Sequence, residues 1–276
     1  MTYRQALENG ILLLESEKIV DAQLDAWYLL SFVTGITRAQ FFMNQREPMD
    51  EEALNKYQRL MQQRANHIPL QHITGEQEFM GITFKVNENV LVPRQDTETL
   101  VEETLKIIPE GSRVLDVCTG SGCILTSLVV LGQNVTGLGV DISADALEVA
   151  RDNGERLVGD RAQFIRSNLF EEVTGKYNVI VSNPPYIKTA EIEKLAPEVR
   201  EHEPRLALDG TDDGLFFYRK IVAQAPEYLT EDGWLLVEIG HDQGAEVYAM
   251  FVEAGFKDVQ VIKDLARNNR VVKGHL

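Results

Sequence analysis

From residue 111 onward, short apolar runs alternate with amphipathic stretches, and this alternation restricts the possible folds more than any other feature of the sequence. The predicted strands are residues 113–118, 134–140, 163–166, 177–182, 234–239, 259–262 and 270–273, and the predicted helices lie after Gly122 and at 144–157, 215–228 and 245–253. Repeated strand–helix units place parallel strands in one sheet. The pattern therefore predicts a doubly wound, mostly parallel α/β sheet, with the last two strands forming an antiparallel hairpin at its edge.

The first 67 residues have helical periodicity instead. Apolar residues recur at intervals of three to four positions, as at Leu24 and Tyr28. Asp21 and Asp50 are predicted N-caps, and Gly35 is a predicted helix stop. We expect a small bundle of four or five helices. It contains no cluster of titratable residues that would suggest catalysis, so it serves either partner recognition or plain packing.

Residues 75–92 link these two regions and have a strand-like pattern. Short, partly alternating runs at 78–84 and 85–91 surround Gly81 and a turn cluster at 87–89, which predicts a β-hairpin. A helix capped by Asp96 or Thr97 is expected next. The predicted domains are a helical domain (1–74), a hairpin linker (75–92) and an α/β domain (93–276).

The charge of the chain is strongly acidic and unevenly distributed. The formal net charge is −16, from 27 basic and 43 acidic residues. Residues 1–75 contain nine acidic and seven basic residues (net −2), so 34 acidic and 20 basic residues (net −14) lie in 76–276. Such a surface repels a phosphate backbone. Stable nucleic-acid binding is therefore not expected, and a basic protein loop is a better partner.

Cysteine content and hydropathy limit the remaining classes. Cys118 and Cys123 have no accompanying Cys or His cluster, so no metal site is predicted and both are expected to be reduced core thiols. No run approaches the roughly 20 apolar residues of a membrane span, and the first nine residues are polar rather than signal-like. We expect a cytoplasmic protein without membrane association, and a monomer.

A glycine-rich turn follows the first strand of the predicted sheet. Residues 114–122 read Val-Leu-Asp-Val-Cys-Thr-Gly-Ser-Gly. Gly120 and Gly122 let the backbone approach a ligand, and the helix that follows offers free N–H groups. Asp141 ends the second strand about 20 residues later, where a carboxylate accepts the hydroxyls of a ribose. A nucleoside-containing cofactor is predicted, either a dinucleotide or S-adenosylmethionine. Asp116, in the first strand, is placed to face a cationic or amino-bearing cofactor.

The tetrapeptide Asn183-Pro184-Pro185-Tyr186 ends the fourth strand, so it lies at the same edge of the sheet. Because prolines lack amide hydrogens, the carbonyls of Asn183 and Pro184 have no local turn donor and are free to accept hydrogen bonds. The Asn183 side chain adds an amide, and Tyr186 adds an aromatic wall. The tetrapeptide suits a planar group that bears an NH2, although a proline-rich turn that ends the strand, with Tyr186 covering the core, is an equal interpretation of these residues alone.

Together, these motifs resemble the protein-(glutamine-N5) methyltransferases that modify peptide-chain release factors, the PrmC/HemK family of class I S-adenosylmethionine-dependent enzymes. The matching segments are the helical amino-terminal region, His72-Ile-Thr-Gly-Glu-Gln-Glu-Phe79, Leu91-Val-Pro-Arg-Gln-Asp-Thr-Glu98, the glycine turn at 119–122, Asp141, Asn183-Pro-Pro-Tyr-Ile187, Glu203-Pro-Arg-Leu-Ala-Leu208 and residues 264–272. Gln95 and Asn168 depart from the family pattern, which usually has proline and aspartate there.

The resemblance implies a Rossmann-like class I methyltransferase fold with a seven-stranded sheet. It also implies S-adenosylmethionine as cofactor, with S-adenosyl-L-homocysteine as product, and a release factor as substrate, whose glutamine lies in a Gly-Gly-Gln loop. The implied cofactor-binding residues are Cys118, Thr119, Gly120, Ser121, Gly122, Asp141, Asn168, Leu169 and Asn183. The implied catalytic residues are Asn183, Pro184, Pro185 and Tyr186, with Asn183 in contact with both cofactor and substrate.

Three rival classes remain open on sequence. An adenine N6-methyltransferase acting on nucleic acid shares the Asn-Pro-Pro-Tyr tetrapeptide, but the acidic charge does not favour it. A non-enzymatic module that binds S-adenosylmethionine has no use for the tetrapeptide, and a nicotinamide dehydrogenase is the third class. The acidic connection at 188–213 is interpreted either as a substrate-binding lid or as a solvated loop.

Overall fold

The computed structural model describes residues 1–276, which form two compact units. One unit contains Met1–Gly75 together with Ala196–His202. The other contains Glu76–Leu195 and Glu203–Leu276. None of the helices has the length and apolar character that crossing a membrane requires.

The first unit is a bundle of helices, as predicted. Its helices are α1 (Tyr3–Ser16), α2 (Ala22–Thr34), α3 (Arg38–Asn44), α4 (Glu51–Ala65), α5 (Leu70–Thr74) and α10 (Pro197–His202). The side chain of Asp50 caps α4 by accepting from two backbone N–H groups, and Gly35 ends α2 in the left-handed conformation. Asp21 precedes α2, but its side chain makes no capping hydrogen bond.

Arg64 joins α10 to the bundle within this unit. Its buried guanidinium donates to the carboxylate of Asp25 at 2.7 Å and also to that of Glu198 in α10. Burial raises the pKa of Asp25, and the bond from Arg64 opposes that rise. Separating Glu198 from Arg64 would leave a buried charge without its partner, which is strongly destabilising. The pairing therefore keeps the middle of the 188–213 connection packed within the helical unit.

The second unit is built on a seven-stranded sheet with the order β5-β4-β3-β6-β7-β9-β8. The strands are β3 (Arg113–Val117), β4 (Thr136–Asp141), β5 (Ala162–Arg166), β6 (Tyr177–Ser182), β7 (Leu229–Glu238), β8 (Lys257–Lys263) and β9 (Asn269–His275). Strands β3 to β7 are parallel, whereas β9 is antiparallel to both of its neighbours. The predicted α/β sheet and its antiparallel edge hairpin are therefore confirmed.

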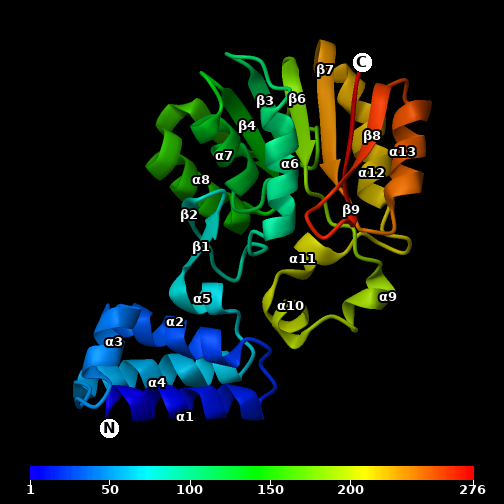
Figure 1. Ribbon diagram of the computed structural model, residues 1–276. Coiled ribbons are helices and arrows are strands. Elements are labelled where there is room, and N and C mark those ends of the chain that lie inside the picture. The colour runs from blue at the N-terminus through cyan, green and yellow to red at the C-terminus, as the bar shows by residue number, and fades with distance from the viewer. The chain divides into compact units, whose positions relative to one another are not determined.

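Helices cover both faces of this sheet, which gives three layers (Figure 1). The helices of this unit are α6 (Gln95–Leu105), α7 (Cys123–Leu131), α8 (Ala144–Val158), α9 (Thr189–Ile192), α11 (Arg205–Leu208), α12 (Phe216–Gln224) and α13 (Gly244–Glu253). Alternate strand residues point to opposite faces. Accordingly, Val179 and Val181 pack with α6, α7 and α8, whereas Ile180 packs with α12 and α13.

Two local predictions were wrong. The linker hairpin consists of β1 (Glu76–Phe79) and β2 (Ile82–Lys85), so its turn, Met80–Gly81, contains the predicted Gly81, but the strands begin earlier than the runs expected at 78–84 and 85–91. Both turn residues have positive φ, at 54° and 71°, as a two-residue hairpin requires. Helix α6 begins at Gln95, and its N-cap is Arg94. Asp96 and Thr97, which were the predicted caps, lie inside the helix.

The order of the strands reverses direction between β3 and β6, since β4 and β5 extend to one side and β7 to the other. In open α/β sheets, ligands bind at the carboxyl ends of the strands at such a switch point. The glycine turn follows β3 and the Asn-Pro-Pro-Tyr segment follows β6, so the two motifs meet at this point of the fold.

Candidate functional site

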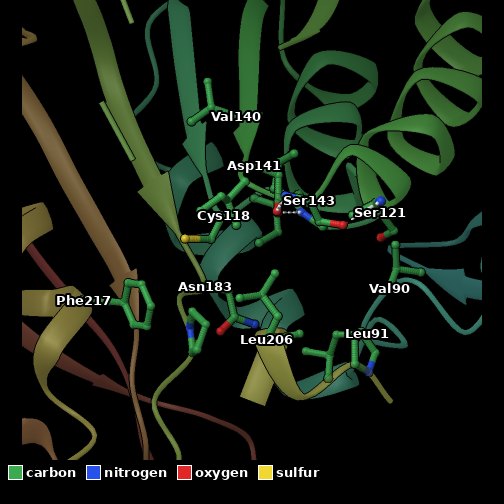
Figure 2. Close-up of a pocket in the computed structure, with 18 of the residues that line it drawn as sticks. Val90, Leu91, Cys118, Ser121, Val140, Asp141, Ser143, Asn183, Leu206 and Phe217 are labelled. Atoms are coloured by element: carbon green, nitrogen blue, oxygen red, sulfur yellow. Dashed lines mark hydrogen bonds between the residues drawn. The ribbon is translucent and has the colours of Figure 1, made fainter. Parts of the chain in front are cut away.

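A cavity of about 360 Å³ lies at the carboxyl ends of β3, β4, β5 and β6. This volume is within the range of small-molecule sites. The residues that follow these strand ends and line the cavity are Cys118, Thr119, Gly120, Ser121, Asp141, Asn168, Leu169, Asn183 and Pro185. In the view of Figure 2, Asp141 and Ser143 lie above the cavity, and Asn183 and Leu206 lie below it.

The turn after β3 is held by the carboxylate at the end of β4. Oδ2 of Asp141 accepts a hydrogen bond from the Gly120 N–H at 2.9 Å, and Oδ1 accepts from the Ser143 N–H at 2.9 Å. Burial raises the pKa of Asp141, while these backbone N–H groups oppose the rise by stabilising the carboxylate. Each carboxylate oxygen has a further lone pair. Asp141 is therefore fixed in place and can still accept two hydroxyl groups from a ligand.

Two residues of the lining adopt left-handed backbone conformations although neither is glycine. Cys118 has φ of 62° and Leu169 has φ of 53°. Such conformations are unfavourable for residues with a Cβ atom and persist where the surroundings enforce them, often at functional sites. Both residues border the cavity, so the strain is located at its wall.

Asp116 does not face the cavity, contrary to the expectation from sequence. Its side chain is fully buried and is not part of the lining. It accepts a hydrogen bond from the Thr119 hydroxyl at 2.6 Å, and burial raises its pKa to about 7. Asp116 thus supports the turn from below instead of meeting a cofactor.

The Asn183–Tyr186 segment is fixed at both ends by hydrogen bonds. The Ser182 hydroxyl donates to the backbone oxygen of Val117 at 2.6 Å, which ties the end of β6 to the end of β3. The side chain of Gln243 donates to the backbone oxygen of Tyr186 at 3.0 Å. Within the segment, Asn183 and Pro185 line the cavity, whereas Pro184 and Tyr186 do not.

The side chains of this segment also have defined partners. Nδ2 of Asn183 donates to the Thr97 hydroxyl at 3.3 Å, and the Tyr186 hydroxyl donates to Oε1 of Glu238 at 3.3 Å. No hydrogen bond in the structure uses the carbonyl oxygens of Asn183 and Pro184 or Oδ1 of Asn183. The segment therefore offers several unused acceptors, as the prolines predicted.

Two further segments close the cavity opposite the strand ends. Glu203, whose side chain is completely buried, accepts from the Val92 N–H at 3.1 Å and from the Arg94 guanidinium at 2.6 Å. These bonds bring together residues 89–94 and 204–207, both of which contribute to the lining. Val90, Leu91 and Leu206 form an apolar part of the wall (Figure 2). We name residues 203–208 the strap.

Most of the residues predicted for the site come together at this cavity, and Gly122 is the main exception among the cofactor residues. Several residues that line the cavity were not predicted from the sequence: Val90, Thr97, Ile142, Ser143, Phe216, Phe217 and Lys220. Leu91 and Leu206 also line it, and they lie in segments that carry the family resemblance, so the resemblance could have indicated them. The α12 residues have no such signal, because they are far from any motif in sequence.

The two departures from the family pattern have local explanations. Gln95 is the first residue of α6, a position that accepts proline but does not require it. Nδ2 of Asn168 donates to Glu171 at 2.7 Å, which leaves Oδ1 as the free end of the amide. Asn168 can therefore present an acceptor to the cavity, as an aspartate would.

Comparison with known proteins gives a consistent result. The chain matches the family model for the PrmC N-terminal domain at residues 5–75 and the Methyltransferase small domain at residues 95–202. It is 43% identical to a release factor glutamine methyltransferase of Geobacter sulfurreducens, over 100% of this chain and 97% of the relative. A relative of the same description from Agrobacterium fabrum is 40% identical over 94% of this chain and 92% of its own.

Among solved structures, a methyltransferase from Pyrococcus furiosus shares the fold. Its TM-score is 0.54 at 17% identity, and the match covers 71% of this chain and 90% of the other. At this identity the likeness shows a shared fold and nothing further.

Proposed function

The chain belongs to the release factor glutamine methyltransferase family, and from this premise we propose that it transfers a methyl group from S-adenosylmethionine to the side-chain amide nitrogen (N5) of the glutamine in the Gly-Gly-Gln loop of peptide-chain release factors. The observation that supports this function best is the Asn183 amide, which is held at the cavity wall with its oxygen unused.

The cavity has the chemistry that S-adenosylmethionine requires. Asp141 would accept the ribose hydroxyls, since its carboxylate is fixed by two backbone N–H groups. The turn from Cys118 to Ser121 would hold the methionine part, because Gly120 has no protein atom within 4 Å of the position that a Cβ would occupy. Asn168 and Leu169 would lie beside the adenine. When bound, S-adenosylmethionine supplies an electrophilic methyl group on a sulfonium.

The substrate amide requires acceptors at its two hydrogens. An amide nitrogen is a poor nucleophile because its lone pair is shared with the carbonyl, so the site must hold the nitrogen where this sharing is reduced. Oδ1 of Asn183 and the carbonyl of Pro184 would accept the two N–H hydrogens, and Tyr186 would pack on the amide plane. Positioning of this kind can supply up to roughly 7–11 kcal/mol of the barrier.

The same acceptors stabilise the reaction electrostatically. Positive charge develops on the nitrogen as the new C–N bond forms, and acceptors aimed at its hydrogens lower the energy of that state. The methylated amide cation is very acidic, so it loses a proton to water without a dedicated base. The cavity lining contains no histidine, and its only lysine is Lys220 of α12.

The helical unit is proposed to recognise the release factor, because the catalytic motifs lie entirely in the other unit. An adenine N6-methyltransferase is not favoured, since the second unit carries most of the acidic excess and would repel a nucleic acid.

The proposal is tested by incubating the protein with a methyl-labelled donor and a purified release factor, with DNA and a release factor Gln→Ala loop variant as parallel substrates. Label on the intact release factor alone is the expected result. Label on DNA, or equal label on the Gln→Ala variant, would contradict the proposed substrate.

A further inference from the structure

We propose that Gln243 is a positioning residue for methyl transfer. Its side chain holds the Asn183–Tyr186 segment and the start of α12 at a fixed separation, and this separation sets the width of the part of the cavity that receives the substrate amide. The inference rests on the proposed function. Gln243 lies outside the cavity lining, at the junction between β7 and α13, and no sequence motif pointed to it.

The side chain of Gln243 uses all of its hydrogen-bonding atoms. Nε2 donates to the backbone oxygen of Tyr186 at 3.0 Å and to that of Gly214 at 3.2 Å. Oε1 accepts from the Gly240 N–H at 2.9 Å, and the Tyr218 hydroxyl lies 3.3 Å from the same oxygen. The residue is 5% exposed. Its amide therefore joins three stretches of backbone inside the protein.

The partners themselves fix the orientation of this amide. The two carbonyl oxygens can only accept hydrogen bonds, and the Gly240 N–H can only donate one. The NH2 group must therefore face Tyr186 and Gly214, whichever way an amide could be placed by shape alone. A side chain without two donors and one acceptor at this reach cannot make the same set of bonds.

Glycine at position 214 permits the close approach of the two segments. A Cβ added to Gly214 would lie 2.4 Å from the backbone oxygen of Tyr186 and 2.7 Å from Nε2 of Gln243. The next residue of the segment is held by the same loop, since the Ile187 carbonyl accepts from the Gly210 N–H at 2.8 Å. The loop before α12 is therefore packed directly on the backbone that follows the two prolines.

A displacement at Tyr186 is expected to reach the acceptors for the substrate amide. The segment is anchored to β3 at its other end, and its two prolines have restricted φ angles, so it has little freedom to absorb a change. Gly214 lies two residues before α12, and Phe217 of that helix and Asn183 both line the cavity (Figure 2). A misplacement of about 1 Å can lower the rate of a reaction by about 100-fold.

The groups proposed to hold the cofactor do not depend on Gln243. Asp141 is fixed by the N–H groups of Gly120 and Ser143, and the strap is held by the bonds of Glu203. None of these bonds involves Gln243 or either carbonyl that it holds. The inference therefore predicts a loss of methyl transfer without a matching loss of cofactor affinity.

Two substitutions of the glutamine separate its hydrogen bonds from its packing. Gln243→Met keeps the length of the side chain and removes both donors and the acceptor. Gln243→Glu keeps the size and the acceptor, but it places an oxygen against two carbonyl oxygens.

A pair of glycine substitutions tests the same contact from the other side. Gly214→Ala places a methyl group against the Tyr186 carbonyl without changing the glutamine. Gly255, after α13, is the matched control. Its φ of 88° is left-handed like the 74° of Gly214, and a Cβ there would meet no atom within 4 Å. Gly255→Ala therefore introduces the same kind of backbone strain without the contact.

Methylation of a release factor is measured with saturating donor, and cofactor affinity is measured by calorimetry with S-adenosylhomocysteine. We expect Gln243→Met, Gln243→Glu and Gly214→Ala to lower kcat by about 10- to 100-fold, with cofactor affinity within about threefold of the wild type. Gly255→Ala is expected to retain kcat within about threefold. A purely structural role would lower the unfolding free energy in urea and leave the kcat of the folded protein unchanged.

A second readout does not require turnover. Hydrogen exchange followed by mass spectrometry is expected to be at least about tenfold faster in peptides covering 183–187 and 210–217 of Gln243→Met than in those of the wild type. Peptides covering the glycine turn at 118–122 are expected to exchange at the wild-type rate, and Gly255→Ala is expected to leave all three regions unchanged.

The inference is overturned if the Gln243 variants and Gly214→Ala retain the kcat of Gly255→Ala, if cofactor affinity falls as far as kcat, or if exchange at 183–187 and 210–217 is unaffected. Should Gln243→Met fail to fold, the isosteric Gln243→Glu and Gly214→Ala decide the kinetic test. A wild type that transfers no label to a release factor refutes the proposed function, whereas hydrogen exchange still decides whether Gln243 holds the two segments together.

Discussion

Two glycines of one turn, Gly120 and Gly122, are expected to respond differently to the same substitution. Both have left-handed backbone conformations, with φ of 55° and 76°. A Cβ added to Gly120 would meet no protein atom within 4 Å. A Cβ added to Gly122 would lie 3.0 Å from two ring atoms of Phe164 and 3.2 Å from the Cβ of Ala150. Gly120 therefore borders the cavity, whereas Gly122 permits close packing beside it.

The expected losses of stability follow from these contacts. The left-handed conformation costs an alanine about 1–2 kcal/mol at either position. Overpacking adds about 1–3 kcal/mol at Gly122. The Phe164 ring has little freedom to move away, because Gly139 and Gly154 also pack against it. A Cβ added to Gly139 or Gly154 would lie 2.6 Å or 2.5 Å, respectively, from an atom of this ring. Gly122→Ala should lose about 2–5 kcal/mol of unfolding free energy, and Gly120→Ala only about 1–2 kcal/mol.

The two variants are compared by urea denaturation without ligand and by calorimetric titration with S-adenosylhomocysteine. Gly120→Ala is expected to bind at least about tenfold more weakly, since its methyl enters the space of the ligand. Gly122→Ala, where it remains folded, is expected to bind within about threefold of the wild type. Equal stability losses, or a binding defect larger in Gly122→Ala than in Gly120→Ala, would refute this assignment.

Three further substitutions test the site. Asn183→Ala should bind S-adenosylhomocysteine within about threefold of the wild type but lose at least about 100-fold in kcat, because the acceptor for the substrate amide is removed; unimpaired turnover would contradict the mechanism. Arg94→Met leaves the Glu203 carboxyl buried without the Arg94 guanidinium, so the strap should loosen. The cofactor is then expected to dissociate about tenfold faster in stopped-flow measurements. An unchanged dissociation rate would show that the strap does not retain the cofactor. The pKa of Asp116 rises on folding from 3.8 to about 7, so the folded wild type holds a proton that the unfolded chain has lost, and its stability falls as pH rises from about 4 to 7. Asp116→Asn lacks this loss and should gain stability relative to the wild type across that window in urea melts at several pH values, whereas a constant difference would exclude Asp116 as its source.

Features that depend only on neighbouring residues in the chain could be predicted from the sequence. The strand at 177–182 and the prolines after it predicted both the position of the tetrapeptide and its unused carbonyl acceptors. The glycine turn and Asp141 predicted a shared ligand edge, because parallel strands end on the same side of a sheet.

The linker hairpin shows where local patterns were insufficient. Its turn is Met80–Gly81, and methionine is not a residue that signals a left-handed conformation. The strand-like runs were expected at 78–84 and 85–91, which is too far along the chain, and the second of these runs includes the turn cluster at 87–89. Tertiary packing fixed the register here: Phe79 and Phe84 of the two strands are both buried against the α/β core.

The sequence alone determined the fold class, the edge of the sheet at which the two motifs lie and part of the set of residues that meet there, because periodicity and strand-end motifs depend on neighbours in the chain. Only the tertiary structure decided how those residues are held. Glu203 closes the cavity through Arg94, 109 positions away, and Glu238 reaches Tyr186 across 52 positions. Asp116, which the sequence placed toward the ligand, is turned into the core. Which face of a strand is buried, and which distant side chain completes a buried hydrogen bond, depends on packing that no local pattern encodes.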